Sequence, residues 1–199
     1  KNLGAGITIP YFWDLGMDKN LTLTSRLFSS ENPIFLGEYH QAFRSSNWIA
    51  DFGYTEGYKK TTSKKKSGDK SHFFSKFTKN FNLKENSNNS LDITLQHVSD
   101  DKYFKLYDIK TNLINKNIDT LENSISFTHE EEDIFLGVNA NIYETLKDNY
   151  IDKYEYTYPE ITFDTNLFSN NTFGNLDLQT NYKAHKYDTN KFTNFLVND

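Results

Sequence analysis

The stretch that decides the fold is Trp48-Ile49-Ala50-Asp51-Phe52-Gly53-Tyr54-Thr55, in which apolar and polar residues alternate. In a β-strand, successive side chains point to opposite faces. One face of this stretch then carries Trp48, Ala50, Phe52 and Tyr54, and the other carries Asp51, Gly53 and Thr55. The alternation predicts a strand with an aromatic stripe against an apolar environment and a small or polar stripe against water.

The same pattern recurs about ten times along the chain, and about 9–11 tilted residues are what a strand needs to cross a bilayer. No helical period persists between these segments, and short polar turns or longer polar loops separate them. The pattern predicts an all-β fold: an antiparallel up-and-down transmembrane β-barrel segment of about ten strands. The predicted strands cover residues 3–13, 19–28, 34–43, 48–58, 71–83, 90–98, 120–128, 134–143, 154–163 and 173–185.

Three segments lack this alternation. We predict that residues 59–70 form a basic, solvated loop and that residues 99–119 form a long connection. No clear order is predicted for residues 187–199. No internal boundary is evident, so residues 1–199 are predicted to form one partial membrane β-barrel domain. The chain opens on Lys1 without an initiator Met, and we expect it to be an internal part of a longer precursor whose targeting segment lies upstream.

The composition agrees with strands that have one apolar and one polar face. Apolar residues make up only 36% and the mean hydropathy is −0.74, yet aromatic residues reach 16%, which is high for a disordered chain. A net charge of −5 argues against nucleic-acid binding, which usually needs a basic stripe. Without cysteine, neither a disulfide framework nor a thiolate metal site can form within the chain.

Motifs of catalysis are absent from the sequence, and the five histidines lie far apart on different predicted strands. His129 beside residues 130–133 suggests a metal site, but adjacent acids in a turn cannot all face one ion, so a solvated turn is favoured. Asp100-Asp101 could hold a divalent cation, although capping or turn roles are favoured. Ser71-His72 is the one local hint of a barrel hydrolase, and it is weak. We therefore expect no enzyme activity, no catalytic residue, no metal and no cofactor.

Pro10 interrupts an otherwise clean strand pattern. Proline cannot donate a hydrogen bond to a sheet ladder, so it belongs on an edge strand or at a weakened pairing. Pro159 raises the same question more weakly. From the residues alone, an ordinary edge-strand proline or a bulge is the favoured interpretation.

A collinear series of short motifs resembles the barrel domain of the LPS-assembly protein LptD family, also called organic solvent tolerance protein. The opening is similar in its Pro-Tyr-aromatic-Trp strand, its Thr-rich strand and its Glu-aromatic strand, here Ile9-Pro10-Tyr11-Phe12-Trp13, Leu21-Thr22-Leu23-Thr24 and Gly37-Glu38-Tyr39-His40. Further similarities are Gly53-Tyr54-Thr55-Glu56-Gly57-Tyr58, Lys70-Ser71-His72-Phe73-Phe74, Val98-Ser99-Asp100-Asp101-Lys102-Tyr103-Phe104 and Tyr158-Pro159-Glu160-Ile161. The resemblance runs in order from about residue 5 to residue 185.

The resemblance implies the first part of a barrel of about 26 strands in the cell outer membrane. In that family a lipoprotein, LptE, plugs the barrel, and lipopolysaccharide arrives from periplasmic bridge proteins along an N-terminal jellyroll domain, which we expect to precede this part of the precursor. It then leaves sideways between the first and last strands, which makes Pro10 a lateral-gate element. Ser25 stands where the family often has a second proline, so a two-proline gate is not implied here.

In this interpretation the polar stripe lines a wet lumen that carries the saccharide head group, while the acyl chains remain in hydrocarbon. Two other interpretations remain open: a soluble β-sandwich or jellyroll binding module, and a general outer-membrane pore or barrel enzyme. The lumen-facing candidates are Asp51, Thr55, Asp92, Thr94, Gln96, Asn175, Asp177 and Gln179.

Overall fold

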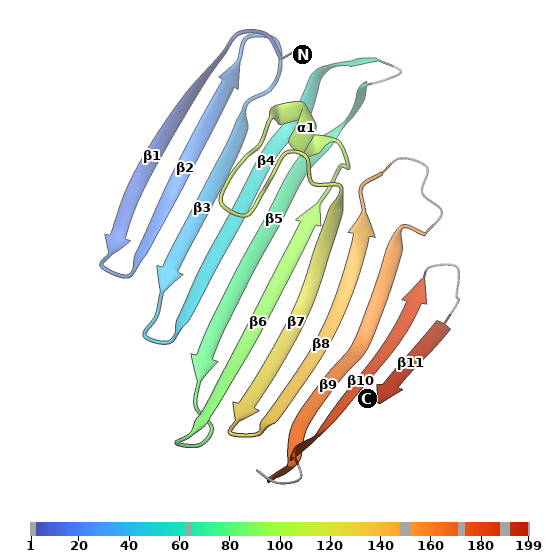
Figure 1. Cartoon of the computed structure of the whole chain (residues 1–199). Helices are drawn as coiled ribbons and strands as arrows, with labels where there is room; N and C mark the ends of the chain where they lie inside the picture. The colour runs from blue at the N-terminus through green and yellow to red at the C-terminus, as the bar shows by residue number, and fades with distance from the viewer. Residues whose placement is uncertain (1–2, 63–64, 148–151, 171–173, 188–191, 199) are drawn as a thin grey trace. The chain divides into compact units, whose positions relative to one another are not determined.

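A computed structural model describes residues 3–62, 65–147, 152–170, 174–187 and 192–198. These residues form eleven strands and one short helix (Figure 1). The elements are β1 Gly6–Gly16, β2 Lys19–Phe28, β3 Ile34–Ala42, β4 Ser46–Thr62, β5 Lys65–Phe81, β6 Ser87–Val98, α1 Tyr103–Tyr107, β7 Thr120–Glu131, β8 Ile134–Thr145, β9 Tyr154–Asn170, β10 Gly174–Tyr187 and β11 Phe192–Asn198.

The strands follow one another in a single sheet in the order of the sequence, from β1 to β11. The strand pairs with a described register are all antiparallel, so the predicted all-β, antiparallel, up-and-down arrangement is confirmed. In the described part of the chain, β1 and β11 are the two edge strands, and Pro10 lies on β1 opposite Thr24. Pro159 lies in β9, where the pairing with β8 shifts register.

Several strand boundaries differ from the prediction, and one strand was not predicted. Residues 59–62 and 65–70 belong to strands and not to the predicted loop, because β4 continues to Thr62 and β5 begins at Lys65. The end of the chain, predicted to lack order, contributes β11. The first strand begins at Gly6 and runs on to Gly16, three residues beyond the predicted end. The lysine-rich ends of β4 and β5 carry too little apolar signal to be recognised as strand.

The chain divides into two compact units. Unit 1 contains residues 1–76 and 95–119, and unit 2 contains residues 77–94 and 120–199. Each unit has one apolar and one polar sheet face.

In unit 1 the apolar face is continuous from β1 to β4. Residues directly opposite one another on neighbouring antiparallel strands share a face. The register places Tyr11, Leu23, Gly37 and Phe52 in one such row. Tyr11 is 61% exposed and Phe52 40% exposed, and the Phe52 ring covers Gly37 so closely that a Cβ there would lie 2.3 Å from the ring. The alternation predicted for residues 48–55 is therefore confirmed, with Phe52 outward and Asp51 on the opposite face.

In unit 2 the polar face is held by hydrogen bonds between neighbouring strands. The Thr78 hydroxyl donates to Asp92 Oδ1 at 2.8 Å, and the Ser126 hydroxyl donates to Asn139 Oδ1 at 2.5 Å. Apolar residues such as Leu136, opposite Phe163, form the other face. These side-chain pairs let a polar face persist without a protein layer over it.

Candidate functional site: a buried cluster beneath residues 99–119

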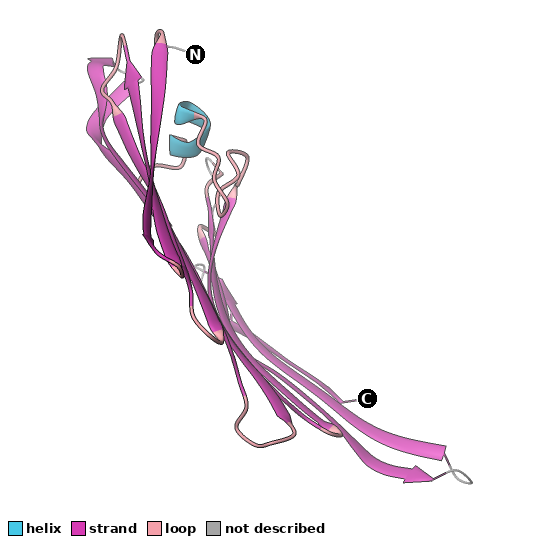
Figure 2. Ribbon diagram, turned by 90° about the vertical axis from the view of Figure 1, so that its left-hand side faces the viewer, coloured by secondary structure: helices cyan, strands magenta, loops and turns pink. Residues whose placement is uncertain are grey.

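The segment of residues 99–119, here called the strap, folds onto the polar face of unit 1 (Figure 2). Asp100 begins the turn: its Oδ1 accepts from the Lys102 N–H at 3.0 Å, and its carbonyl accepts from the Tyr103 N–H at 3.0 Å. Helix α1 then ends at Asp108, whose φ of 50° is left-handed and whose N–H bonds back to Phe104. The turn role predicted for Asp100 is thus confirmed.

The strap buries its apolar side chains against the sheet. Tyr103, Phe104 and Tyr107 in α1 are almost fully buried, as are Ile109 and Ile114 after it. Only a long connection was predicted for this segment. The sequence does carry a signal of the helix, because the large apolar residues Tyr103, Phe104 and Tyr107 have helical spacing in a stretch without strand alternation.

At the centre of the cluster, His72 of β5 contacts Asp51 of β4. Its Nε2 lies 2.9 Å from Asp51 Oδ1, and the two side chains are 0% and 1% exposed. The imidazole packs against the rings of Tyr103 and Phe104, each with a centroid distance of 5.4 Å. Gly53 makes room for it, because a Cβ there would lie 2.4 Å from His72 Cε1. The histidine is therefore fixed from the sheet side and from the strap side.

Three buried atoms of this cluster have no hydrogen-bond partner: Asp51 Oδ2, His72 Nδ1 and the Tyr103 hydroxyl. Burial raises the pKa of Tyr103, the nearby Tyr107 and Asp51 add to the increase, and Arg26 opposes it. A His–Asp pair can activate a nucleophile, but only where substrate reaches it. The side chains of His72 and Asp51 are both inaccessible to solvent, so their contact serves to hold the strap.

Charged contacts fasten the strap at its edges. The Arg26 guanidinium donates through Nη1 to the carbonyls of Tyr107 at 3.0 Å and Asp108 at 3.2 Å, where the open carbonyls of α1 collect negative charge. Lys70, which is also buried, forms an ion pair with Asp100. The strap is therefore anchored both before α1 and after it.

The predicted lumen residues fall into two groups. Asp51 and Thr55 lie on the predicted polar face but are buried beneath the strap, so protein rather than water covers them. Gln96 is half-buried in unit 1. In unit 2, Asp92 accepts from Thr78, and Thr94 lies opposite Ser124. The remaining three lie on β10 and are exposed: Asn175, Asp177 and Gln179.

No group of three described histidine, aspartate or glutamate side chains is placed to hold a metal ion. At the predicted acidic turn, His129 Nδ1 lies 2.7 Å from the Asn89 side-chain oxygen, and Glu131 pairs with Lys84 at 2.7 Å. Among the helices of the described residues, none is long and apolar enough to cross a membrane.

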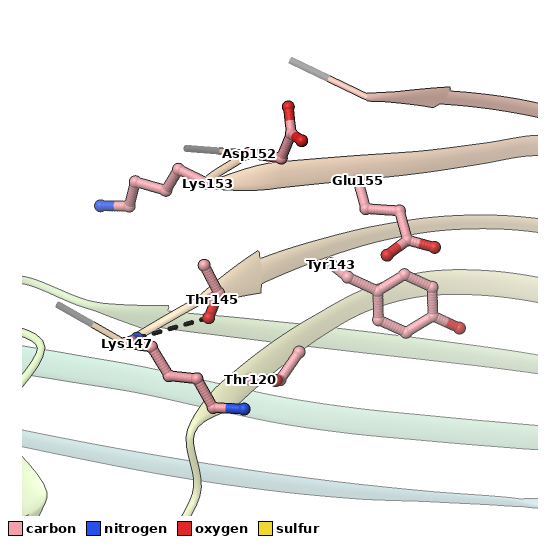
Figure 3. Close-up of a pocket in the computed structure, with 7 residues that line it drawn as sticks. All are labelled: Thr120, Tyr143, Thr145, Lys147, Asp152, Lys153 and Glu155. Atoms are coloured by element: carbon pink, nitrogen blue, oxygen red, sulfur yellow. Dashed lines mark hydrogen bonds between the residues drawn. The ribbon is translucent and has the colours of Figure 1, made fainter. Parts of the chain in front are cut away.

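A small hollow in unit 2 has a volume of about 130 Å³. Figure 3 shows its seven lining side chains, in which Lys147 and Lys153 extend away from each other. Lys153 already pairs with Glu144 at 3.0 Å. Because its charges do not converge and it holds only a few water molecules, this hollow is a poor candidate for a site.

No protein-family model matches the chain, and no curated protein matches it. Function is therefore inferred from the residue pattern and from the geometry of the sheet.

Proposed function

We propose that this chain is the first part of an outer-membrane β-barrel that inserts lipopolysaccharide into the outer leaflet. The observation that carries the proposal is the exposed aromatic and aliphatic face of unit 1. Tyr11, Phe52 and Tyr54 are 61%, 40% and 45% exposed, and they belong to one face that spans β1 to β4. Soluble monomers rarely expose contiguous apolar patches larger than a few hundred Å². Lipid is the environment that suits such a face.

The opposite face supplies a route for a polar cargo. Moving a sugar and phosphate head group through hydrocarbon would strip its water at high cost. The polar side chains of unit 2, including the predicted Asp92, Asn175, Asp177 and Gln179, would keep such a head group hydrated inside a closed barrel. No bond of the cargo is made or broken in this role, so no catalytic group is required.

The exit in this proposal is a seam at β1. Unpaired backbone groups are costly in lipid, so a lateral opening needs a strand junction that is already weak. Pro10 removes one ladder donor from the edge strand β1. The closing strands, the lipoprotein plug LptE and the periplasmic bridge proteins are partners that the resemblance to the LptD family implies for the full-length protein.

A Pro10→Ala variant of the full-length protein tests this role. It restores an N–H donor worth about 0.5–1.5 kcal/mol, which would shift an open seam toward closure by about 2- to 10-fold. We expect a matching fall in newly made lipopolysaccharide at the cell surface, with unchanged protein in the outer-membrane fraction. Thr8→Ala, two residues away on the same strand, is the control and should deliver lipopolysaccharide normally.

Three results would contradict the proposal. If the Pro10→Ala and Thr8→Ala variants deliver equal amounts of lipopolysaccharide to the cell surface, Pro10 has no role in a lateral gate. A full-length protein that stays monomeric in buffer without detergent would favour the soluble binding module. Stable ion conductance without lipopolysaccharide delivery would favour the general pore.

A further inference from the structure

Phe12 lies on the wrong face for a membrane-facing or core aromatic residue. The register places it in a row with Thr22, Glu38 and Asp51, which is the polar face of unit 1. Its neighbours Tyr11 and Trp13 point to the apolar face, as alternation requires. Phe12 is nevertheless 62% exposed. A large exposed ring on a polar face is the kind of feature that marks a contact with a ligand.

A hollow of about 370 Å³ adjoins this ring, within the size range of small-ligand pockets. It lies where β1 turns into β2, at one end of β3 (Figure 1). Three of its polar side chains come from a second row across the same three strands, Asp14, Asn20 and His40. One face of an aromatic ring thus stands beside a line of three hydrogen-bonding side chains.

The polar groups of this hollow are held in place by their surroundings. Asp14 Oδ1 accepts from the Gly16 N–H at 3.2 Å, which orients the carboxylate at the turn. His40 Nε2 lies 3.3 Å from the Asn112 side-chain nitrogen, so the strap reaches the edge of the hollow. A site whose polar groups are oriented before binding loses less entropy when a ligand arrives.

The chemistry of these groups matches an uncharged sugar ring. A carboxylate accepts, an amide donates and accepts, and an imidazole can do either, which suits hydroxyl groups that both donate and accept. The C–H face of a pyranose is apolar and can lie flat on Phe12. The lining residues carry two carboxylates, Asp14 and Asp18, against one ammonium, Lys19, so a phosphate group is disfavoured.

We infer that Phe12, Asp14, Asn20 and His40 form a saccharide-binding subsite on the polar face of β1 to β3. This inference deepens the proposed function and rests on it where it assigns the saccharide to the polar head group of lipopolysaccharide. The subsite would hold an uncharged sugar of the head group next to the edge strand that carries Pro10.

Binding measurements on the full-length protein in detergent test the subsite. The probes are deacylated lipopolysaccharide and maltohexaose, a neutral glucan, titrated by calorimetry. We expect deacylated lipopolysaccharide to bind, and Phe12→Ala to weaken it by about tenfold or more, as loss of an aromatic stacking surface does elsewhere. Phe12→Trp should retain binding, which separates loss of the ring from loss of the fold. Tyr11→Ala is the matched control, since it removes an equally exposed ring from the opposite face.

Equal affinities of the Phe12→Ala and Tyr11→Ala variants would overturn the subsite. Equal binding of the wild-type protein to both probes would overturn its assignment to lipopolysaccharide and support a general glycan site. Absence of saccharide binding in a protein that still delivers lipopolysaccharide overturns the subsite alone. Ring-dependent binding by a protein that delivers none supports the subsite and overturns the transport proposal.

Discussion

Gly53→Ala is expected to release the strap from the sheet. Gly53 lies in β4 on the face that the strap covers, and an added Cβ would lie 2.4 Å from His72 Cε1 and 2.7 Å from Leu36 Cδ2. His72 cannot move aside at low cost, because Asp51 holds one edge of its ring and Tyr103 packs against the ring from the strap side. The new methyl group must displace either the histidine or the strap.

The expected cost comes from three contributions. Overpacking a well-filled site costs about 1–3 kcal/mol. Breaking the buried contact between His72 and Asp51 leaves both groups without a partner and adds about 1–3 kcal/mol. Replacing a strand glycine returns about 0.5–1 kcal/mol of backbone entropy. The net loss in the free energy of unfolding is therefore about 1–5 kcal/mol.

Gly137→Ala is the matched control. Gly137 is also a strand glycine without positive φ, and its added Cβ would approach nothing nearer than Phe135 at 3.3 Å. We expect it to change the free energy of unfolding by less than about 1 kcal/mol. The assay is urea unfolding in detergent, together with trypsin cleavage after Lys105, an exposed residue of the strap. If both variants lose the same stability and cleave at the same rate, the inference that His72 is fixed between sheet and strap is wrong.

Two further predictions concern the strap. Burial raises the pKa of Tyr103 above its ordinary value of about 10, so the native state keeps the phenol protonated while the unfolded chain ionises it. The contribution of the protonated Tyr103 to the free energy of unfolding is complete below about pH 10 and is lost as the pH rises toward the native pKa. The Tyr103→Phe variant should therefore lose less stability than the wild-type protein between pH 8 and pH 11, as measured by urea unfolding. An unchanged dependence of stability on pH would contradict this prediction. Arg26→Lys should cost about 1–2 kcal/mol, because an ammonium cannot reproduce the guanidinium contacts to Tyr107 and Asp108. Trypsin cleavage in the strap as slow as in the wild-type protein would count against that role for Arg26.

The sequence predicted the strands because their two faces differ in the residues themselves. The period of two in residues 48–55 is enough to place Phe52 and Tyr54 on one face and Asp51 on the other. The same argument placed Asp92 and Gln179 in strands of alternating polarity. Alternation depends only on local chain geometry, so it survives without knowledge of which strands pair.

The strap could not be predicted from that signal. Residues 99–119 have no strand period, and a helix of five residues is too short to show a helical one. Its position depends on long-range contacts, such as the one between Arg26 and the carbonyl of Tyr107, which are 81 residues apart. The His72–Asp51 contact was missed for the same reason, since each residue alone is an ordinary polar member of a strand.

The two units stabilise their polar faces in different ways. In unit 2, polar side chains such as Thr78 and Asp92 bond across strands and remain accessible to water. In unit 1, Asp51 and His72 are buried beneath the strap, where loss of either partner leaves an uncompensated polar group that water cannot reach. Substitutions should therefore be tolerated at accessible polar-face positions such as Thr78 and Asp92 and costly at Asp51 and His72 beneath the strap, even where the two sequences look equally hydrophilic.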